Sequence, residues 1–313
     1  MRSLSDMSGI TVVIPTLERS ECLRVCIEDL LAQNYAPIEI LIVDQSAEPD
    51  EYMRGLARRS EAVSYHHVAF QSLPKARNYG WRHARYDAIL YLDDDIRCQP
   101  GLIAGHARSL QGAGVGVVGG GVDELSGSYQ SNPEHGGTGI FNRTTAFPQR
   151  SWTARGEFEV DHAAGGNFSV WRRVLEACGG IDESLGVGAA LYEETDFCLR
   201  AKRLGYRVLY NGGARITHLA IPRGGCRVLS RATYVRGLAH NRAVLIGRHV
   251  ERGRQFPALA RLMMTGISFA VRDRDPFLVG ACLRGVKQGL HDSRILPPAA
   301  NAACLNAIEV RDR

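Results

Sequence analysis

The first hundred residues alternate between short unbroken apolar runs and stretches in which apolar residues recur every three or four positions. The runs are ITVVIP (10–15), IEILIVD (38–44) and AILYL (88–92), and such runs are typical of strands buried on both faces of a parallel sheet. Helical spacing begins after Ser20, an expected N-cap, and recurs over 51–59 and over 74–85, which Pro74 opens. A further strand is predicted over 63–70. This alternation predicts an α/β fold with a mainly parallel sheet flanked by helices.

Polar residues stand where these strands are expected to end. Ligands of open parallel sheets bind beyond the carboxyl ends of the strands, and those ends fall at Pro15–Thr16, Asp44 and Asp93–Asp95. Three adjacent carboxylates repel one another and are easily satisfied only by water or a cation. They indicate either a solvated turn or a cation site, and their place at the expected ligand edge favours the cation.

The middle of the chain has weaker patterns. The glycines of GAGVGVVGGG (112–121) spell G-x-G-x-x-G, but a helix-like segment precedes them and the valines themselves indicate a strand. A tightly packed strand is therefore favoured over a dinucleotide loop. Residues 123–160 are polar and predict a long loop, which is uncommon in a compact domain without a functional reason. A Gly-rich turn and a helix ending at Gly179 are predicted over 163–180, and another helix over 192–206.

Charge is unevenly distributed along the chain. Residues 200–313 hold 21 Lys and Arg against 6 Asp and Glu, whereas residues 1–199 hold 17 against 27. An acidic half suits a cation, and a basic, helical segment beyond residue 228 suits an anionic surface.

Three classes of protein are disfavoured. The eight cysteines include no C-x-x-C pair, so neither a zinc site nor a disulfide framework is indicated, and a reducing cytoplasm fits. No secretory signal is expected, because no long apolar region follows Arg2. The longest apolar stretch, 256–271, is too short to span a membrane and contains Arg261.

An ordered set of motifs resembles glycosyltransferase family 2, the inverting nucleotide-sugar transferases of the GT-A fold. The motifs are VVIPTLER (12–19), EILIVDQS (39–46), LPKARNYGWRHA (73–84), YLDDDI (91–96), GGNFSVWRR (165–173), GGIDESLG (179–186) and EETDFCLRAKRLGYRVLYNGGARITHL (193–219). The resemblance implies a GT-A, Rossmann-like catalytic domain over 1–225, with a donor-binding half over about 1–121 and an acceptor half over about 122–225. Residues 226–313 then form a basic helical C-terminal extension.

The resemblance implies a divalent metal, Mn²⁺ or Mg²⁺, at the family's D-x-D position, which Asp93–Asp95 occupies. A leaving diphosphate develops charge that such a cation stabilises, and hard cations prefer oxygen ligands. By resemblance Asp95 ligates the metal directly, Asp93 acts there through water or contacts the ribose, and His218 completes the metal shell. Asp94 has the least defined role.

The resemblance also implies a catalytic base. An inverting transfer needs a base on the face opposite the leaving group, and the family's position for it is taken by Glu194, where the commonest pattern has Asp. Glu193 and Asp196 are alternatives, and Asp196 could instead orient a neighbour. Acids in a first helical turn also complement the helix dipole, by about 0.3–1 kcal/mol each, without any catalytic role.

The remaining candidates are donor contacts implied by the resemblance. They are Pro15, Thr16, Glu18, Asp44, Arg77, Asn78, Asp93, Asp94, Gly166 and Asn167, with Gly165 beside them. The loop over 15–18 and Asp44 would contact the base and ribose, Arg77 the phosphates or the base, and the 165–167 turn the transferred sugar.

The expected function is metal-dependent, inverting sugar transfer from a UDP, GDP or dTDP donor to a glycan or lipid-linked acceptor, in cell-envelope or exopolysaccharide assembly. The basic helices either touch an anionic membrane from the cytoplasmic side or pack on the catalytic domain, and no motif supports nucleic-acid binding. The alternatives are a non-catalytic nucleotide-sugar-binding module and a phosphohydrolase that uses Asp93 and Asp95, which Ile96-Arg97 suits poorly.

Overall fold

The computed structural model describes residues 9–125, 137–228, 230–295 and 297. Its centre is a nine-stranded sheet. The strands are β1 (Ile10–Thr16), β2 (Ile38–Asp44), β3 (Val63–His67), β4 (Ala88–Leu92), β5 (Ile96–Cys98), β6 (Val115–Glu124), β9 (Glu157–Glu159), β10 (Asn167–Trp171) and β11 (Arg207–His218). They lie in the order β3-β2-β1-β4-β10-β6-β11-β5, with β9 against β11. Only β10, β5 and β9 run antiparallel to their neighbours, so the predicted mainly parallel sheet is confirmed.

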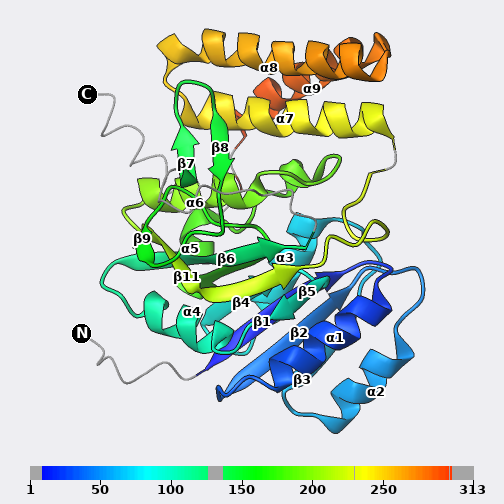
Figure 1. The fold of residues 1–313 in the computed structure, drawn as a ribbon, viewed down its shortest axis with the longest axis vertical. Coiled ribbons are helices and arrows are strands. Elements are labelled where there is room, and N and C mark those ends of the chain that lie inside the picture. The colour runs from blue at the N-terminus through cyan, green and yellow to red at the C-terminus, as the bar shows by residue number, and fades with distance from the viewer. Residues whose placement is uncertain (1–8, 126–136, 229, 296, 298–313) are drawn as a thin grey trace.

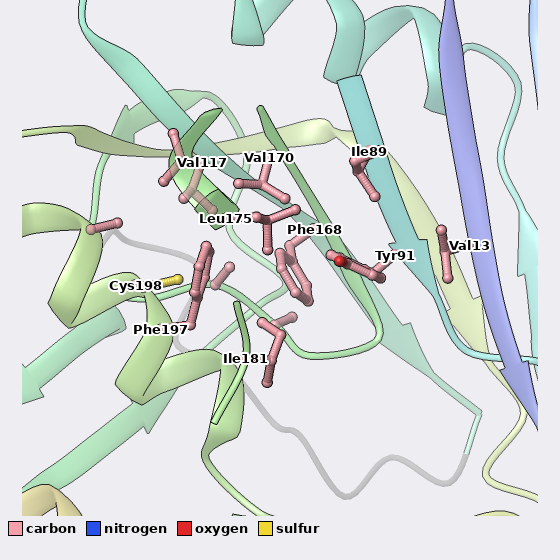
Figure 2. Packing of buried hydrophobic residues seen from close by; sticks show 14 of the residues in the cluster. Val13, Ile89, Tyr91, Val117, Phe168, Val170, Leu175, Ile181, Phe197 and Cys198 are labelled. Atoms are coloured by element: carbon pink, nitrogen blue, oxygen red, sulfur yellow. The ribbon is translucent and has the colours of Figure 1, made fainter. Parts of the chain in front are cut away.

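Helices cover both faces of this sheet (Figure 1). They are α1 (Ser20–Leu31), α2 (Glu51–Arg59), α3 (Leu73–His83), α4 (Leu102–Leu110), α5 (Arg172–Cys178), the 3-10 turn η1 (Glu183–Gly186) and α6 (Glu193–Arg203). Alternate strand residues enter different cores: Val12 and Ile14 pack with α1, α2 and α4, and Val13 packs with α3, α5 and α6. Figure 2 shows the core that contains Val13, around Tyr91 and Phe168. Burial on both faces explains why these strands are unbroken apolar runs.

Three local predictions need correction. Ser20 is the first residue of α1 and not its N-cap, which is Arg19. The expected loop over 123–160 contains the hairpin of β7 (Thr138–Asn142) and β8 (Phe147–Arg150) as well as β9, while residues 126–136 lie outside the described ranges. In the segment 163–180 the predicted turn is present at 165–166, but strand β10 follows it, so the helix is confined to the seven residues of α5.

The Gly-rich segment is the predicted strand, β6. A Cβ atom on Gly120 would collide with the side chain of Asn167 and the carbonyl oxygen of Ala214. The glycines there allow neighbouring chain segments to approach closely, and they form no dinucleotide loop.

A layer of three helices follows β11, as the pattern beyond residue 228 predicts. It comprises α7 (Arg231–His249), α8 (Arg252–Asp273) and α9 (Phe277–Asp292). Figure 1 shows α7 nearest the sheet domain and α8 on the outside. Arg248 and His249 of α7 both contact Asp196 of α6, so this layer is packed on the sheet domain through buried polar contacts. Within the described ranges, no helix is both long and apolar enough to cross a bilayer.

Candidate active site

A cavity of about 1000 Å³ opens at the carboxyl ends of β1 and β4. Its wall includes Thr16 after β1, Asp93–Asp95 after β4, Glu193 and Glu194 at the start of α6, His218 at the end of β11 and Tyr234 of α7. The parallel sheet therefore forms its cavity at the strand ends, where the sequence predicts a ligand.

Asp93, Asp95 and His218 form the one cluster of candidate metal ligands found among the described residues, with ligand atoms all within 4.8 Å of one another. β11 pairs with β5 so that His218 lies opposite Ile96, beside the acidic turn. His218 Nε2 lies 3.2 Å from Asp95 Oδ1. Burial acts to raise the pKa of Asp95, but the contact with His218 and the charge of Arg19 outweigh it and lower that pKa. Asp95 is therefore held in the ionised form that a metal ligand needs.

The chemistry of this cluster fits the metal that the sequence predicts. Two carboxylates suit hard divalent cations such as Mg²⁺ and Mn²⁺, and an imidazole beside them is a common nitrogen ligand for transition metals. No thiolate belongs to the cluster.

Asp94 anchors the loop that follows β1. Its Oδ2 accepts a hydrogen bond from Thr16 Oγ1 at 2.7 Å, and its Oδ1 accepts one from Arg19 at 2.8 Å. Burial raises the pKa of Asp94 to about 6 although Arg19 opposes the shift. Arg19 also lies 3.1 Å from Asp95 and donates to the carbonyl of Ile221, which joins the loop after β1 to the segment after β11.

Arg19 is missing from the sequence-based candidates. Its partners Asp94 and Ile221 lie 75 and 202 residues away, so no local pattern identifies its position in the cavity wall. Its place in the VVIPTLER motif is the only sequence feature that points to the cavity, and that motif identifies the loop rather than Arg19 itself.

Arg77 of α3 is buried between the two acidic groups of the cavity. Its Nη1 donates to Glu193, and its Nη2 donates to the carbonyl of Gly165 at 2.7 Å and lies 3.7 Å from Asp93. The ring of Phe168 lies 5.5 Å from the guanidinium carbon, within the range of a cation–π contact. Arg77 therefore compensates the charge of both carboxylates from a fixed position.

Glu193 and Glu194 differ in their surroundings. Burial and the neighbouring charge of Glu194 raise the pKa of Glu193, even though Arg77 contacts it. Glu194 Oε1 accepts from Thr195 Oγ1 at 3.1 Å, and its Oε2 would lie 3.3 Å from a Cβ on Gly165. Glu193 is thus engaged with Arg77, while Glu194 lies against the turn that borders the cavity.

Asp196 does not line the cavity and faces α7. Its Oδ2 accepts from Arg200 at 2.8 Å, and its Oδ1 lies 3.2 Å from Arg248 Nη1 and 2.8 Å from His249 Nε2. Burial would raise its pKa, but Arg200 and Arg248 hold it well below the usual range. Its position suits the alternative of a residue that orients its neighbours.

Two predicted donor residues, Asn78 and Asn167, are buried outside the cavity wall. Asn78 exchanges two hydrogen bonds with the backbone of Ile181, at 2.8 and 2.9 Å. Asn167 donates to the carbonyls of Gly121 and Ala214, at 3.0 Å each. Both therefore join chain segments beneath the cavity.

Gly165 and Gly166 border the cavity as the sequence predicts. A Cβ on Gly166 would collide with the carboxylate of Asp93. Glycine at this position leaves room for the acidic turn.

Some of the residues predicted to contact the nucleotide line the cavity, and others support the loops beside it. Pro15 and Thr16 line the cavity, but Glu18 and Asp44 do not. Asp44 Oδ2 accepts from Tyr65 at 2.6 Å, and Glu18 Oε1 accepts from the backbone of Ala47 at 2.9 Å. These two acids therefore brace the loops beside the cavity.

Residues with no sequence signal complete the opposite wall. Trp152, Tyr192, Arg231 and Tyr234 line the cavity, and the guanidinium of Arg150 lies 4.8 Å from the centre of the Tyr192 ring. Aromatic and basic side chains from distant segments are gathered here by the fold.

Comparison with known proteins agrees with this geometry. The family model described as Glycosyl transferase family 2 matches residues 11–176. A curated relative, the glucosyl-dolichyl phosphate glucuronosyltransferase of Haloferax volcanii, is 26% identical over 233 residues, which cover 67% of this chain and 68% of that protein.

Solved structures share the fold. The mannosyltransferase PcManGT from Pyrobaculum calidifontis, in complex with GDP-Man and Mn²⁺, aligns with a TM-score of 0.56 at 14% identity, covering 99% of this chain and 82% of that one. GalNAc-T7 with UDP, GalNAc and Mn²⁺ aligns with a TM-score of 0.58 at 14% identity, covering 87% and 59%. S. aureus TarS 1-349 aligns with a TM-score of 0.57 at 13% identity, covering 97% and 92%. The GT-A fold is therefore confirmed.

Proposed function

Because this chain belongs to glycosyltransferase family 2 and is a glycosyltransferase, we propose that it transfers a sugar by a metal-dependent, inverting displacement from a nucleotide donor to an acceptor hydroxyl. The observation that carries this proposal is one cavity that holds both the Asp93, Asp95 and His218 cluster and Glu194. Family membership sets aside the binding-module and phosphohydrolase alternatives.

The proposed reaction uses the chain's own residues as follows. Glu194 accepts the proton of the acceptor hydroxyl while that oxygen forms its bond to the anomeric carbon. The bond from this carbon to the diphosphate oxygen breaks, its electron pair leaves with the diphosphate, and the anomeric configuration inverts. A divalent cation held by Asp93, Asp95 and His218 would compensate the charge that develops on the leaving group. Arg77 keeps Asp93 and Glu193 in place during the transfer.

Substrate class and location are part of the same proposal. The solved relatives carry GDP-Man or UDP with Mn²⁺, and the curated relative is named for a dolichyl phosphate substrate. These names support a nucleotide-diphosphate donor and a lipid-linked acceptor. We extend the proposal to donors of UDP, GDP or dTDP type and to a glycan or lipid-linked acceptor in cell-envelope assembly, as the sequence resemblance implies. We place the enzyme at the cytoplasmic face of a membrane, with residues 1–225 as the catalytic unit and 226–313 as the extension that meets the acceptor or the lipid.

A thermal-shift screen tests the proposal. UDP-, GDP- and dTDP-sugars are each added with and without Mn²⁺ to the wild type and to Asp95→Ala. A bound ligand at a hundred times its dissociation constant stabilises the folded state by about 2.7 kcal/mol, so one donor should raise the melting temperature only when Mn²⁺ is present. The shift should be absent in Asp95→Ala. A wild type that no nucleotide stabilises in the presence of Mn²⁺ would overturn the proposal.

A further inference from the structure

Helix α8 has two apolar faces, and only one is covered by the rest of the described protein. The inner row is Ala258, Leu262, Gly266 and Ala270, all buried against α7 and α9. The outer row is Phe256, Ala260, Met264, Ile267 and Val271, all exposed. Each helical residue advances by about 100°, so the mean directions of the two rows differ by about 140° around the helix. Packing within the helix layer therefore explains why the inner row is apolar, but it does not explain why the outer row is apolar.

The outer row is large and strongly exposed. Phe256 is 81% exposed, Met264 61% and Val271 73%, and Phe277 at the start of α9 is 82% exposed. Isolated exposed apolar residues are normal on a protein surface, whereas a continuous row along a helix marks a binding face.

Charge on α8 distinguishes between partners. α8 holds four arginines and one acidic residue, Asp273 at its last position, and Glu251 is its N-cap. Three of them, Arg254, Arg261 and Arg272, fall on one flank of the outer row by the same helical geometry. Arg254 and Arg272 lie 3.6 and 3.2 Å from Glu251 and Asp273, the acids at the two ends of the helix. An apolar row beside a flank of net positive charge is the pattern of a helix that lies in the interface of an anionic bilayer.

The same helix contacts residues that line the cavity. Arg231 and Tyr234 of α7 line the cavity wall. Arg231 Nε lies 2.6 Å from Asp273 at the end of α8, and the ring of Tyr234 is 6.0 Å from that of Phe269. Figure 1 shows α8 on the outside of the layer. A surface that receives α8 would thus lie near the part of the cavity wall that α7 forms.

We propose that the outer face of α8, with Phe277, docks on an anionic lipid surface. This docking would keep the cavity close to an acceptor that is embedded in the membrane. The inference rests on the proposed function and adds to it the contact surface and the lipid charge. Docking is peripheral, because α8 and the other described helices are not long and apolar enough to span a bilayer.

Co-sedimentation of the full chain with vesicles tests the docking surface. Vesicles of phosphatidylglycerol and phosphatidylcholine are compared with pure phosphatidylcholine, at low and high salt. The double variant Met264→Glu/Val271→Glu introduces charge into the apolar row. The double variant Arg254→Glu/Arg261→Glu reverses the charge of its arginine flank. The matched controls are Leu31→Glu, 44% exposed on α1, and Arg58→Glu/Arg59→Glu, both exposed on α2.

The wild type and both controls should bind anionic vesicles at low salt and lose binding at high salt. Each α8 variant should reduce the bound fraction at least tenfold. Equal binding to both lipid compositions, or α8 variants that bind like the controls, would overturn the inference. So would a wild-type dimer that Met264→Glu/Val271→Glu dissociates while vesicles are not bound, because a second copy would then cover the row. The Mn²⁺-dependent donor shift, measured on the same variants without lipid, reports separately on the proposed function.

Discussion

Arg77 and Glu193 form a buried ion pair between α3 and the first turn of α6, across 116 residues of sequence. Both side chains are only 2% exposed. Because Asp93 lies 3.7 Å from the same guanidinium, this one arginine compensates acids on two walls of the cavity. The pair links the strand end that carries the predicted metal ligands to the helix that carries the proposed base.

Truncating Arg77 should destabilise the protein. Arg77→Ala leaves the buried Glu193 carboxyl and the Gly165 carbonyl without their donor, and each buried polar group left unsatisfied costs about 1–3 kcal/mol. Urea unfolding at pH 7 measures the change in the free energy of unfolding. Arg58→Ala, an exposed arginine on α2, is the control and should change it by less than about 0.5 kcal/mol. Equal stabilities for the two variants would show that the pair contributes nothing to the fold.

Asp95 and Asp94 should differ in their effect on metal. Asp95 belongs to the ligand cluster with His218, whereas Asp94 holds Thr16 and Arg19. Asp95→Ala should abolish both Mn²⁺ binding, measured by calorimetry in the presence of the nucleotide, and sugar transfer. Asp94→Ala should weaken donor binding and retain Mn²⁺ binding. Loss of Mn²⁺ binding in Asp94→Ala alone would reverse the two assignments.

Substitutions of Glu194 and Asp196 should have different effects, the first on catalysis and the second on stability. Glu194→Gln removes the proposed base, and general base catalysis contributes about 10²- to 10⁴-fold, so turnover should fall by that factor while the donor still binds. Asp196→Asn should lower the melting temperature, because Arg200 loses its buried anionic partner and Arg248 keeps only Asp182, and should leave turnover per folded molecule within a few-fold. The opposite pattern would make Asp196 the base.

Three buried histidines should make stability depend on pH. Burial lowers the pKa of His106, His162 and His249 to about 4, from an ordinary value of 6.5. Between those two values these rings bind more protons in the unfolded chain than in the folded one. These three rings therefore lower the free energy of unfolding as pH falls from 6.5 towards 4, by up to about 1.4 kcal/mol per pH unit each. The raised pKa values of Asp94 and Glu193 act in the opposite direction over this range, so the contribution of one ring is measured by substituting that ring.

Urea unfolding at a series of pH values measures this slope. His106→Gln should reduce it, since one histidine no longer contributes, even where the variant is less stable overall. An unchanged slope in His106→Gln would contradict the buried, neutral state of this ring.

Local sequence determines many of the strands and helices of this protein. The run AILYL is buried on both faces, so it can only be a central strand, and the acids that follow it must fall at the sheet edge. The same reasoning predicts the strand in the Gly-rich segment and the helices beyond residue 228. These predictions succeed because a strand or a helix is stabilised by burial of its own periodic apolar residues.

Tertiary structure alone decides what each polar residue contacts. Glu194 and Asp196 stand two positions apart on α6, so they point to nearly opposite sides of the helix, and the sequence does not reveal which side faces the cavity. The answer depends on Arg248 and His249, which lie more than 50 residues later and bind Asp196. Arg19 likewise acquires its place from Asp94 and Ile221. Apolar periodicity acts within one element, whereas the partner of a buried charge comes from whichever distant segment the fold places beside it.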